Sequence, residues 1–335
     1  MAATIEDIAQ AAGVSVATVS RVLNGSPKVA SPTRRRVLRL IDQMAYAPNN
    51  LARNLRARGL RVFGLVISDI RNPFFTSVER GVEDAARASG FSVLLTNTDE
   101  QPEREAESLR MLLVERVAGV IVVPTGGTRH EPVQALLRLG IPLVALDRPL
   151  PNVQVDTVQT DNTLGVRLLV EHLYLAHGHT RLGIISGPHS VGSAAQRARA
   201  FADALDDLGL ERRAEWDVEG NFREEGGQAA AARLLEAADR PAAVLVANNR
   251  MTLGALRATR DLGLRVPDDV AIVGFDDPPW ASLLAPPLTT VAHATYDLGR
   301  TAAELLGRRL ADPQRAPATV LLPPTLVVRA SCGAH

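Results

Sequence analysis

A set of small and polar side chains within residues 16–24 has the chemistry to contact the edges of DNA bases. An arginine can donate two hydrogen bonds to O6 and N7 of guanine, and small neighbours let the helix backbone enter the groove. The segment supplies Arg21 one turn after Val16 and Ala17, with Ser20 and Asn24 on the same side of the expected helix. This pattern is typical of a helix that reads the major groove. An ordinary pair of surface helices is the alternative.

Two short helices around one glycine would position these side chains. Thr4 can cap the first helix, and Asp7 follows three residues later in a capping-box pattern. Apolar residues then recur at i, i+3, i+4 and i+7, which gives that helix one buried stripe. Gly13 supplies the turn, and Ser15 can cap the second helix. The arrangement predicts a helix-turn-helix.

Basic charge is concentrated in the same part of the chain. A third helix, expected to begin with Ser31 as its cap and Pro32 at its first position, completes an all-α head over residues 1–46. Ten basic and three acidic residues lie between Met1 and Arg61, a net charge of +7. The whole chain has 37 residues of each sign, so the remainder carries −7. This asymmetry concentrates the attraction for phosphates at one end.

Residues 47–60 form a short, proline-led and basic segment. Leu51 and Leu55 lie one helical turn apart in the stretch 46–56, which is shorter than the roughly 12–15 residues at which isolated helices become marginal in water. One interpretation is a plain linker. The other is a hinge helix that forms only on DNA and inserts Leu55 as an apolar wedge in the minor groove. The residues alone leave both open.

The body, residues 61–335, alternates apolar runs of strand length with amphipathic stretches. Unbroken Val, Ile and Leu runs predict strands buried on both faces, hence parallel sheets covered by helices. About 275 residues exceed one such core, so we expect two lobes. The runs are 62–67, 91–96, 119–123, 142–146, 182–186, 242–247 and 270–275, and the amphipathic stretches include 76–89, 102–115, 162–176, 194–208, 224–238 and 250–262.

Polar and aromatic side chains follow several of these runs. Ligands of open α/β sheets bind beyond the carboxyl ends of the strands, which here is the cleft between the lobes. Carboxylates and a guanidinium can hold vicinal hydroxyls while aromatic rings cover the apolar face of a sugar, so the set favours a carbohydrate-like ligand. An aspartate at such a junction is, alternatively, only a helix cap. The candidates are Asp69, Phe74, Phe75, Thr125, Asp147, Ser193, Arg197, Phe222, Asn248 and Asp276.

No catalytic motif is complete. Residues 187–193 have the spacing of a phosphate loop but not its lysine, because Lys28 in the head is the only lysine. Neither a G-x-G-x-x-G after the first strand nor a G-x-S-x-G elbow occurs. We therefore expect no enzyme and no cofactor.

Three histidines, His172, His177 and His179, cluster at the end of an expected helix. They could suggest a metal, but no neighbouring cysteine or close set of carboxylates completes a site in the sequence, so we predict none. Cys332 has no evident base and is not expected to act as a nucleophile. With one cysteine there is no internal disulfide.

We see no secretory signal and no apolar run of roughly 18–20 residues, and expect a cytoplasmic, nucleoid-associated protein without membrane contact.

Several segments in order resemble the lactose-repressor/galactose-repressor family of bacterial transcription regulators. They cover nearly the whole chain. The segments are TIEDIAQAAGVSVATVSRVLN (4–24), SPTR (31–34), YAPNNLARNL (46–55), RVFGLVISDIRNPFF (61–75), RVAGVIVVP (116–124) and VPDDVAIVGFDD (266–277). The resemblance implies a homodimer that binds a palindromic double-stranded DNA operator. It also implies a small-molecule effector in a two-lobed, periplasmic-binding-protein-like body with doubly wound sheets.

By this resemblance, base edges would be contacted by Val16, Ala17 and Arg21. The residues that would bind phosphates or help to fix the register of the head on DNA are Ser15, Thr18, Ser20 and Asn24. In the hinge, Leu55 would be the wedge, and the DNA contacts there are assigned to Asn49, Ala52, Arg53, Leu55 and Arg56. The expected lobes are an N-lobe of about 61–161 and 293–323 and a C-lobe of about 162–292 and 324–335. All ten body candidates would lie at or near the effector pocket.

Three positions depart from the usual family pattern. Asn249 stands where the family normally has aspartate, which removes a charge near the pocket floor. His293 and Ala294 replace a usual Gln-Pro, and we favour packing over ligand contact for His293. Val191 stands where purine-responsive members carry arginine, which weakens a nucleobase effector.

The resemblance implies a repressor of sugar-utilisation genes that is released from DNA by a small carbohydrate. The alternative is a solute-binding sensor of the same two-lobed fold with a partner other than DNA. Of the three hypotheses, a sugar-modifying enzyme is the least favoured. The chain ends at His335 without added leucine heptads, so we expect a dimer rather than a tetramer.

Overall fold

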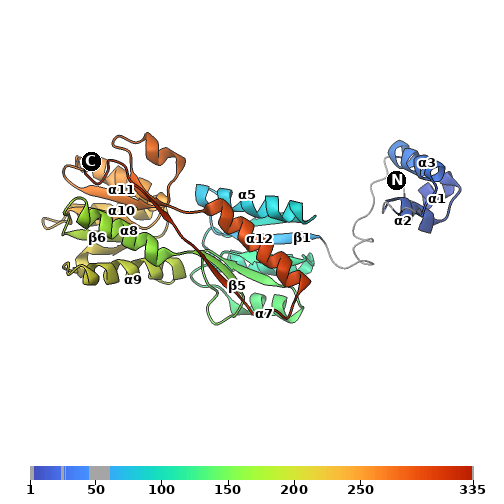
Figure 1. Ribbon diagram of the computed structural model, residues 1–335, viewed down its shortest axis with the longest axis horizontal. Coiled ribbons are helices and arrows are strands. Elements are labelled where there is room, and N and C mark those ends of the chain that lie inside the picture. Colours follow the sequence, from blue (N-terminus) through green and yellow to red (C-terminus); the bar gives the residue numbers. More distant parts are fainter. Residues whose placement is uncertain (1–3, 24–25, 27, 45–60, 334–335) are drawn as a thin grey trace. The chain divides into compact units, whose positions relative to one another are not determined.

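The computed structural model describes residues 4–23, 26, 28–44 and 61–333. The chain divides into two compact units, residues 1–59, which contain the head, and residues 60–335, which contain the body, and the two are considered separately. The head contains helices α1 (Ile5–Ala12), α2 (Val16–Leu23) and α3 (Ser31–Gln43) (Figure 1). None of the helices in these described ranges is long and apolar enough to cross a membrane.

Local hydrogen bonds set the ends of the head helices. Thr4 and Asp7 form the expected capping box, and Gly13 ends α1 in the left-handed conformation at φ 62°. Ser15 accepts a hydrogen bond from the Thr18 backbone N–H at 3.2 Å, so it caps α2 as predicted. The cap expected at Ser31 is wrong by one position, because Ala30 is the N-cap and Ser31 is already helical. Proline is compatible with the whole first turn, so it does not specify the first residue sharply.

The first sheet of the body is fully parallel and has the strand order β11-β5-β4-β3-β1-β2. Its strands are β1 (Val62–Ile67), β2 (Ser92–Asn97), β3 (Gly119–Val122), β4 (Leu143–Leu146), β5 (Asp156–Thr160) and β11 (Thr319–Leu322). Successive residues of β1 serve two cores, because side chains of a strand alternate between faces. Leu65 and Ile67 pack with α5 (Pro73–Ala88) and α12 (Thr295–Ala311). Val66 packs with α6 (Pro102–Val114) and α7 (His130–Arg138).

The second sheet has the order β12-β10-β9-β8-β6-β7, and only β12 runs antiparallel to its neighbour. Its strands are β6 (Leu182–Ser186), β7 (Asp217–Glu219), β8 (Ala243–Val246), β9 (Ala271–Phe275), β10 (Thr289–Ala292) and β12 (Thr325–Val327). Helix α8 (Asn162–Leu175) packs on α9 (Gly192–Asp207), and α10 (Glu224–Leu235) packs on α11 (Asn249–Asp261). Short 3₁₀ helices span Ala214–Trp216 and Pro279–Leu283. The two-lobed α/β body is confirmed.

The chain passes between the sheets three times. The crossings follow β5, β10 and β11, which puts α12 and β11 with the first sheet and β12 with the second. We call the part around the first sheet the N-lobe and the part around the second the C-lobe. Strands β5, β7, β10, β11 and β12 were not among the predicted apolar runs. They are short or rich in threonine, so their sequences lack an unbroken aliphatic run, although β5 and β10 lie inside their sheets.

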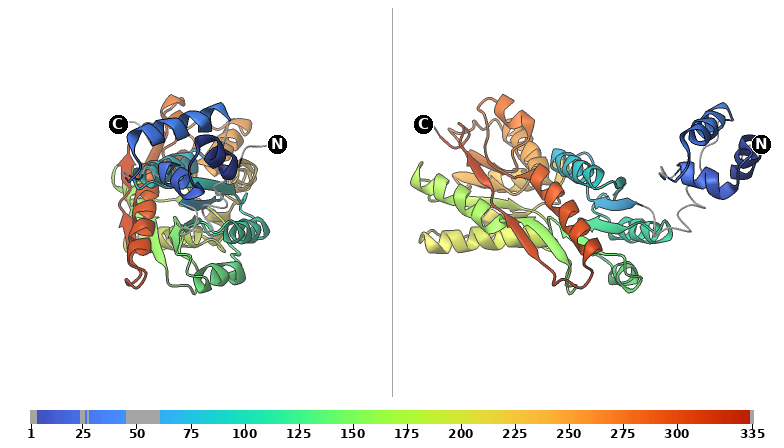
Figure 2. Two further views of the ribbon diagram at one scale, coloured as in Figure 1. Left: turned by 90° about the vertical axis from the view of Figure 1, so that its right-hand side faces the viewer. Right: turned by 45° about the vertical axis from the view of Figure 1, so that its right-hand side comes forward.

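Helices α5 and α12 lie against each other in the N-lobe (Figure 2). Glycines allow their backbones to approach: a Cβ built on Gly299 would lie 1.9 Å from the Val78 carbonyl oxygen, and one on Gly81 would lie 2.0 Å from that of Tyr296. Because backbone atoms cannot move aside like side-chain ends, these two positions accept no larger residue without separating the helices.

Gly299→Ala is therefore expected to destabilise the body by about 1–3 kcal/mol or more, as overpacking does. Gly307→Ala is the matched control in the same helix. A Cβ there meets nothing within 4 Å, so alanine is expected to stabilise by roughly 0.5–1 kcal/mol through helix propensity. Thermal unfolding of both variants by circular dichroism checks the pair. Equal midpoints would contradict the assigned close approach.

Candidate ligand cavity and DNA-contact surface

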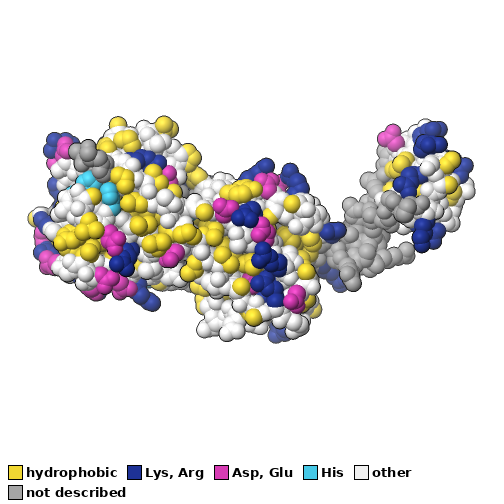
Figure 3. All heavy atoms as spheres, in the orientation of Figure 1, with side chains coloured by type: hydrophobic (Ala, Val, Ile, Leu, Met, Phe, Trp, Pro, Cys, Tyr) yellow, Lys and Arg dark blue, Asp and Glu magenta, His cyan; other side chains and the backbone are white. Residues whose placement is uncertain are grey.

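The outward side of α2 presents the side chains predicted to contact DNA. Ser15, Val16, Ala17 and Arg21 are exposed, whereas Thr18 and Ser20 are half-buried. Ile8, Val19 and Val37 fill the head core, so the opposite side of α2 is committed to packing. Basic side chains are spread over the visible face of the head (Figure 3). Asn24, Asn49, Ala52, Arg53, Leu55 and Arg56 lie outside the described residues, and their roles stay predictions.

A cavity of about 540 Å³, counted with its open mouth, lies between the two lobes of the body. Residues after strands of both sheets line it, as expected where parallel strands end. Nine of the ten predicted candidates contribute to the wall, and Thr125 does not. The lining residues are Asp69, Asn72, Phe74, Phe75, Asp99, Glu100, Asp147, Arg148, Ser193, Arg197, Phe222, Arg223, Asn248 and Asp276.

Arg148 is neutralised by carboxylates of its own lobe. Its guanidinium makes a two-pronged contact with Glu100, at 2.7 and 2.8 Å, and its Nε lies 3.2 Å from Asp147. Burial acts to lower the pKa of Arg148, but Glu100 and Asp147 outweigh it and raise that pKa. Burial likewise acts to raise the pKa of Glu100, and Arg148 outweighs it, so that pKa lies below its ordinary value. Arg148, Glu100 and Asp147 thus form one ion-pair network in the wall of the cavity.

Arg197 is held differently. Nε donates to the side-chain oxygen of Asn162 at 2.8 Å, Nη1 donates to the Ala247 carbonyl at 2.6 Å, and the guanidinium lies 3.9 Å over the Phe275 ring. Burial lowers the pKa of Arg197, and the more distant Asp276 and Asp147 act against that. Among the described residues Nη2 has no protein acceptor, so it can donate to a ligand in the cavity.

Asp276 is fixed from two sides. One carboxylate oxygen accepts the backbone N–H of Asn249 at the start of α11, and the other lies 2.9 Å from Nε2 of His293. His293 is 1% exposed at its side chain, packs edge-on against Phe74 and Phe275, and has Thr160 at its other ring nitrogen. The packing interpretation of His293 is confirmed. Because His293 lies against Asp276, it also orients a carboxylate of the cavity wall.

Two direct hydrogen bonds join the lobes beside the cavity. Nδ2 of Asn249 donates to the side-chain oxygen of Asn72 at 2.8 Å, and Arg223 donates to the Asp99 carbonyl at 2.9 Å. The departure at Asn249 therefore provides an amide donor where aspartate offers only acceptors. Asn248 is a helix cap as well as a wall residue, because its oxygen accepts the Met251 N–H at 2.8 Å.

Backbone conformations disfavoured for L-residues gather at this cavity. Of seven non-glycine residues with positive φ in the described ranges, five line the wall. They are Asp99, Glu100, Asp147, Phe222 and Asp276. Each such residue costs of order 1–3 kcal/mol, which persists only where the surroundings impose it, as at ligand sites.

Thr125 is drawn away from the cavity by a buried carboxylate. Its backbone N–H donates to Glu105 at 2.6 Å, and Thr128 also donates to Glu105. The prediction that Thr125 lines the pocket is wrong in this structure. A residue that follows a strand can either contact a ligand or hold its own loop in place. Thr125 does the second, because its backbone N–H is bonded to Glu105 on α6.

Burial raises the pKa of Glu105, although the hydrogen bonds from Thr125 and Thr128 act against it. A raised pKa in the folded state contributes stability at low pH that is lost as pH rises from about 4.3 through the folded value. Glu105→Gln removes this titration, so its thermal midpoint should gain on that of the original chain from pH 4 towards pH 7. Glu107→Gln, exposed on the same helix, is the control and should show no such gain. Parallel pH profiles for Glu105→Gln and the unchanged chain would refute the assignment.

Five wall residues escaped the sequence analysis. Asn72, Asp99, Glu100, Arg148 and Arg223 were not among the candidates, although Asp99 and Glu100 follow β2 and Arg148 follows Asp147. The strand-end rule applied to β2 would have found the two acids. Nothing local marks Asn72 or Arg223, because their role depends on the opposite lobe.

The expectation that no cysteine lies near the histidine cluster is wrong. Cys332 lies in the C-lobe with its Sγ 3.3 Å from Nε2 of His172. The two residues are 160 positions apart in the chain, so no spacing rule could place them together.

The fold and the cavity define a class: a helix-turn-helix head followed by a two-lobed body with a ligand cavity, which is a ligand-responsive transcriptional regulator. Comparison with known proteins agrees. Residues 4–49 match the model of bacterial regulatory proteins of the lacI family, and residues 170–332 match a periplasmic binding protein-like domain. The chain belongs to the lacI family of bacterial DNA-binding regulators.

Relatives align along the full length. The chain is 34% identical over 334 residues to the HTH-type transcriptional regulator DegA of Bacillus subtilis, covering 99% of this chain and 98% of that one. It is 33% identical to the ribose operon repressor of Haemophilus influenzae, covering 98% of each. Among solved structures it is similar to the lac repressor dimer bound to operator and the anti-inducer ONPF, with a TM-score of 0.88, 30% identity and complete coverage of both chains. The complex of the transcriptional regulator CelR with cellobiose matches with a TM-score of 0.75 and 33% identity, covering 98% and 99%.

Proposed function

We propose that this regulator is a repressor whose effector is an uncharged carbohydrate bound in the cavity between the lobes. The observation that carries the proposal is the composition of the wall, which combines five carboxylates, three guanidinium groups and three phenylalanine rings. Arg148 is already paired with Glu100 and Asp147, so the groups left for a ligand are predominantly hydrogen-bond acceptors. Sugar hydroxyls can donate to such acceptors, and rings can cover the apolar face of the sugar.

The charges around the cavity balance once Arg71, which pairs with Asp69, and Arg104, which pairs with Asp99, are counted with the three guanidinium groups of the wall. A balanced wall favours a neutral effector, because an anion would add unpaired negative charge in a partly buried setting. Two relatives support the sugar class by their names alone: a ribose operon repressor and a regulator in complex with cellobiose.

We propose further that two chains bind a palindromic operator, each with α2 in the major groove. The exposed set on α2 and its Arg21 support this, as does the similarity to a repressor dimer bound to operator. The hinge segment 47–60 with Leu55 is proposed to order only on DNA, and the protein is proposed to act in the cytoplasm, where its DNA target is. Because the lobes meet at Asn72–Asn249 and Asp99–Arg223, a ligand that favours one lobe arrangement can shift the population and release the operator.

A thermal-shift screen of the full chain tests the effector class. The panel contains neutral mono- and disaccharides, their phosphate esters, sugar acids and nucleobases. A ligand at 100 times its dissociation constant adds about 2.7 kcal/mol to the stability of the folded state. We expect a neutral sugar to raise the melting temperature and to weaken operator binding in a mobility-shift assay. Stabilisation only by phosphate esters, acids or bases would overturn the carbohydrate assignment.

A further inference from the structure

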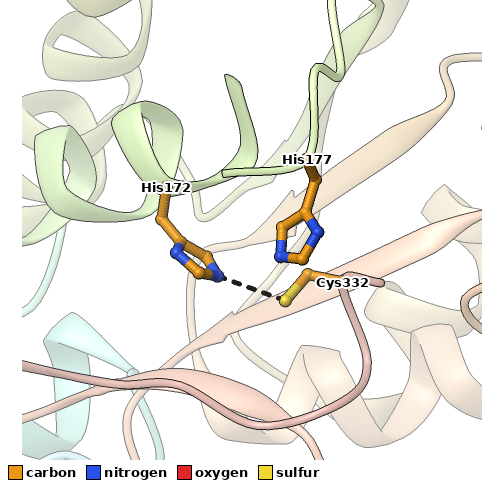
Figure 4. A group of neighbouring side chains, drawn as sticks. All are labelled: His172, His177 and Cys332. Atoms are coloured by element: carbon orange, nitrogen blue, oxygen red, sulfur yellow. Dashed lines mark hydrogen bonds between the residues drawn. The ribbon is translucent and has the colours of Figure 1, made fainter. Parts of the chain in front are cut away.

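We propose that His172, His177 and Cys332 form a binding site for one zinc-type divalent cation in the C-lobe, separate from the effector cavity. One nitrogen of each histidine and the cysteine sulfur all lie within 4.8 Å of one another. His172 comes from the last turn of α8, His177 from the loop that follows, and Cys332 from the segment after β12. Both imidazoles lie beside the sulfur (Figure 4).

The spacing fits a tetrahedral cation with little movement. Zinc binds histidine nitrogen at about 2.0–2.1 Å and cysteine sulfur at about 2.3 Å, so ligand atoms of one ion lie about 3.3–3.6 Å apart. Nε2 of His172 is already 3.3 Å from the sulfur of Cys332. Closing a separation of 4.8 Å to this spacing requires a shift of about 1.2–1.5 Å, which rotation of the half-buried His177 ring can supply.

The donor set selects the kind of cation. Two imidazoles and one thiolate suit zinc and similar borderline-soft ions, whereas magnesium and calcium require oxygen ligands. With three protein ligands in the part of the chain that the structure describes, a tetrahedral ion has a fourth position that water can fill, as in open zinc sites. The cysteine is fully buried and the histidines are half-buried, so a cation would enter from the histidine side. Histidine side chains are visible on the surface of this lobe (Figure 3).

The cysteine is held in place by the lobe itself. Thr289 Oγ1 lies 3.1 Å from the sulfur, and a ring nitrogen of His179 lies 3.0 Å from the Cys332 carbonyl. The preceding Ser331 is locked between the Thr289 N–H and the Ile272 carbonyl. Partners of this kind orient ligands and raise metal affinity. A bound cation would fasten the segment after β12 to the end of α8 and thereby stabilise the C-lobe.

Cobalt(II) titration of the untagged, reduced full chain tests the site directly. Cys332 is the only cysteine, so a thiolate-to-cobalt charge-transfer band can arise from no other residue. We expect this band to saturate at one equivalent and to be displaced by zinc. Cys332→Ser should abolish it, and His172→Gln or His177→Gln should weaken binding at least about tenfold. His130→Gln, an exposed histidine of the N-lobe, is the matched control and should titrate like the original chain.

Each outcome of these titrations either supports the cation site or overturns it. No charge-transfer band in the original chain overturns the proposal whatever the variants do, which covers the case that Cys332→Ser does not fold. A band that persists unchanged in both folded histidine variants, with folding checked by circular dichroism, also overturns it. A zinc-dependent rise in melting temperature that His177→Gln removes and His130→Gln keeps supports it.

Discussion

Arg21→Ala is expected to weaken operator binding more than any other single change in the head. One arginine paired to guanine contributes about 1–3 kcal/mol of discrimination, and a dimer places two copies on a palindrome. The loss should therefore reach about 2–6 kcal/mol, or between about 30-fold and about 2.5 × 10⁴-fold in affinity. Arg21 is exposed in the last turn of α2, whose other side is buried in the head core, so the substitution should not unfold the head.

Base preference, more than affinity, identifies the contact. An operator is first selected from random duplexes with the original protein, and both proteins are then titrated onto it and onto symmetric single-base variants at one salt concentration. Arg21→Ala should lose discrimination at one symmetric guanine. Arg39→Ala, an exposed basic residue on α3, is the control and should lower affinity for all sequences alike. An unchanged base preference in Arg21→Ala would exclude it as the reading residue.

Arg197→Met is expected to abolish the response to effector while operator binding without ligand remains. Hydrogen bonds from a charged group contribute about 1.5–3 kcal/mol each, so losing the donors that face the cavity should weaken ligand binding at least about 100-fold. Methionine keeps an apolar side chain over the Phe275 ring. It leaves the Ala247 carbonyl and the Asn162 side-chain oxygen without their partner, so some loss of stability accompanies the change.

Arg199→Met, exposed on the same helix α9, is the matched control. Calorimetric titration uses the sugar found by thermal shift, and circular dichroism confirms that both variants are folded. Arg199→Met should bind like the original chain. If a folded Arg197→Met bound the sugar within about threefold of the original affinity, Arg197 would be a structural residue of the cavity and no ligand contact.

Strand ends were a reliable guide to the cavity, with limits that have a physical cause. Asp147, Asn248 and Asp276 each follow an apolar run directly, Asp69 follows one after a single serine, and all four line the wall. Thr125 follows such a run too, yet the buried Glu105 holds its loop. A residue after a strand is near the crevice by topology, but the partner that its backbone finds decides which way it turns.

Residues close in sequence determined much of the head without help from the rest of the molecule. The Thr4–Asp7 capping box and the Gly13 turn join groups at most a few positions apart, so their conformations follow from local sterics and hydrogen bonding. Unbroken aliphatic runs likewise specified most strands of the two sheets, because burial on both faces favours apolar residues. They did not specify β5 and β10, which lie inside their sheets but carry buried polar residues.

Only the tertiary structure decided the contacts that join distant segments. The Arg148–Glu100 ion pair, the Asn72–Asn249 bond across the cleft and the approach of His172 to Cys332 bridge 48, 177 and 160 positions. The chain entropy lost in closing such loops is recovered from the packing of whole sheets and helices, and no residue near either partner encodes that packing. The ends of the strands predicted where a ligand could bind. The packing of the two lobes determined which side chains face that place.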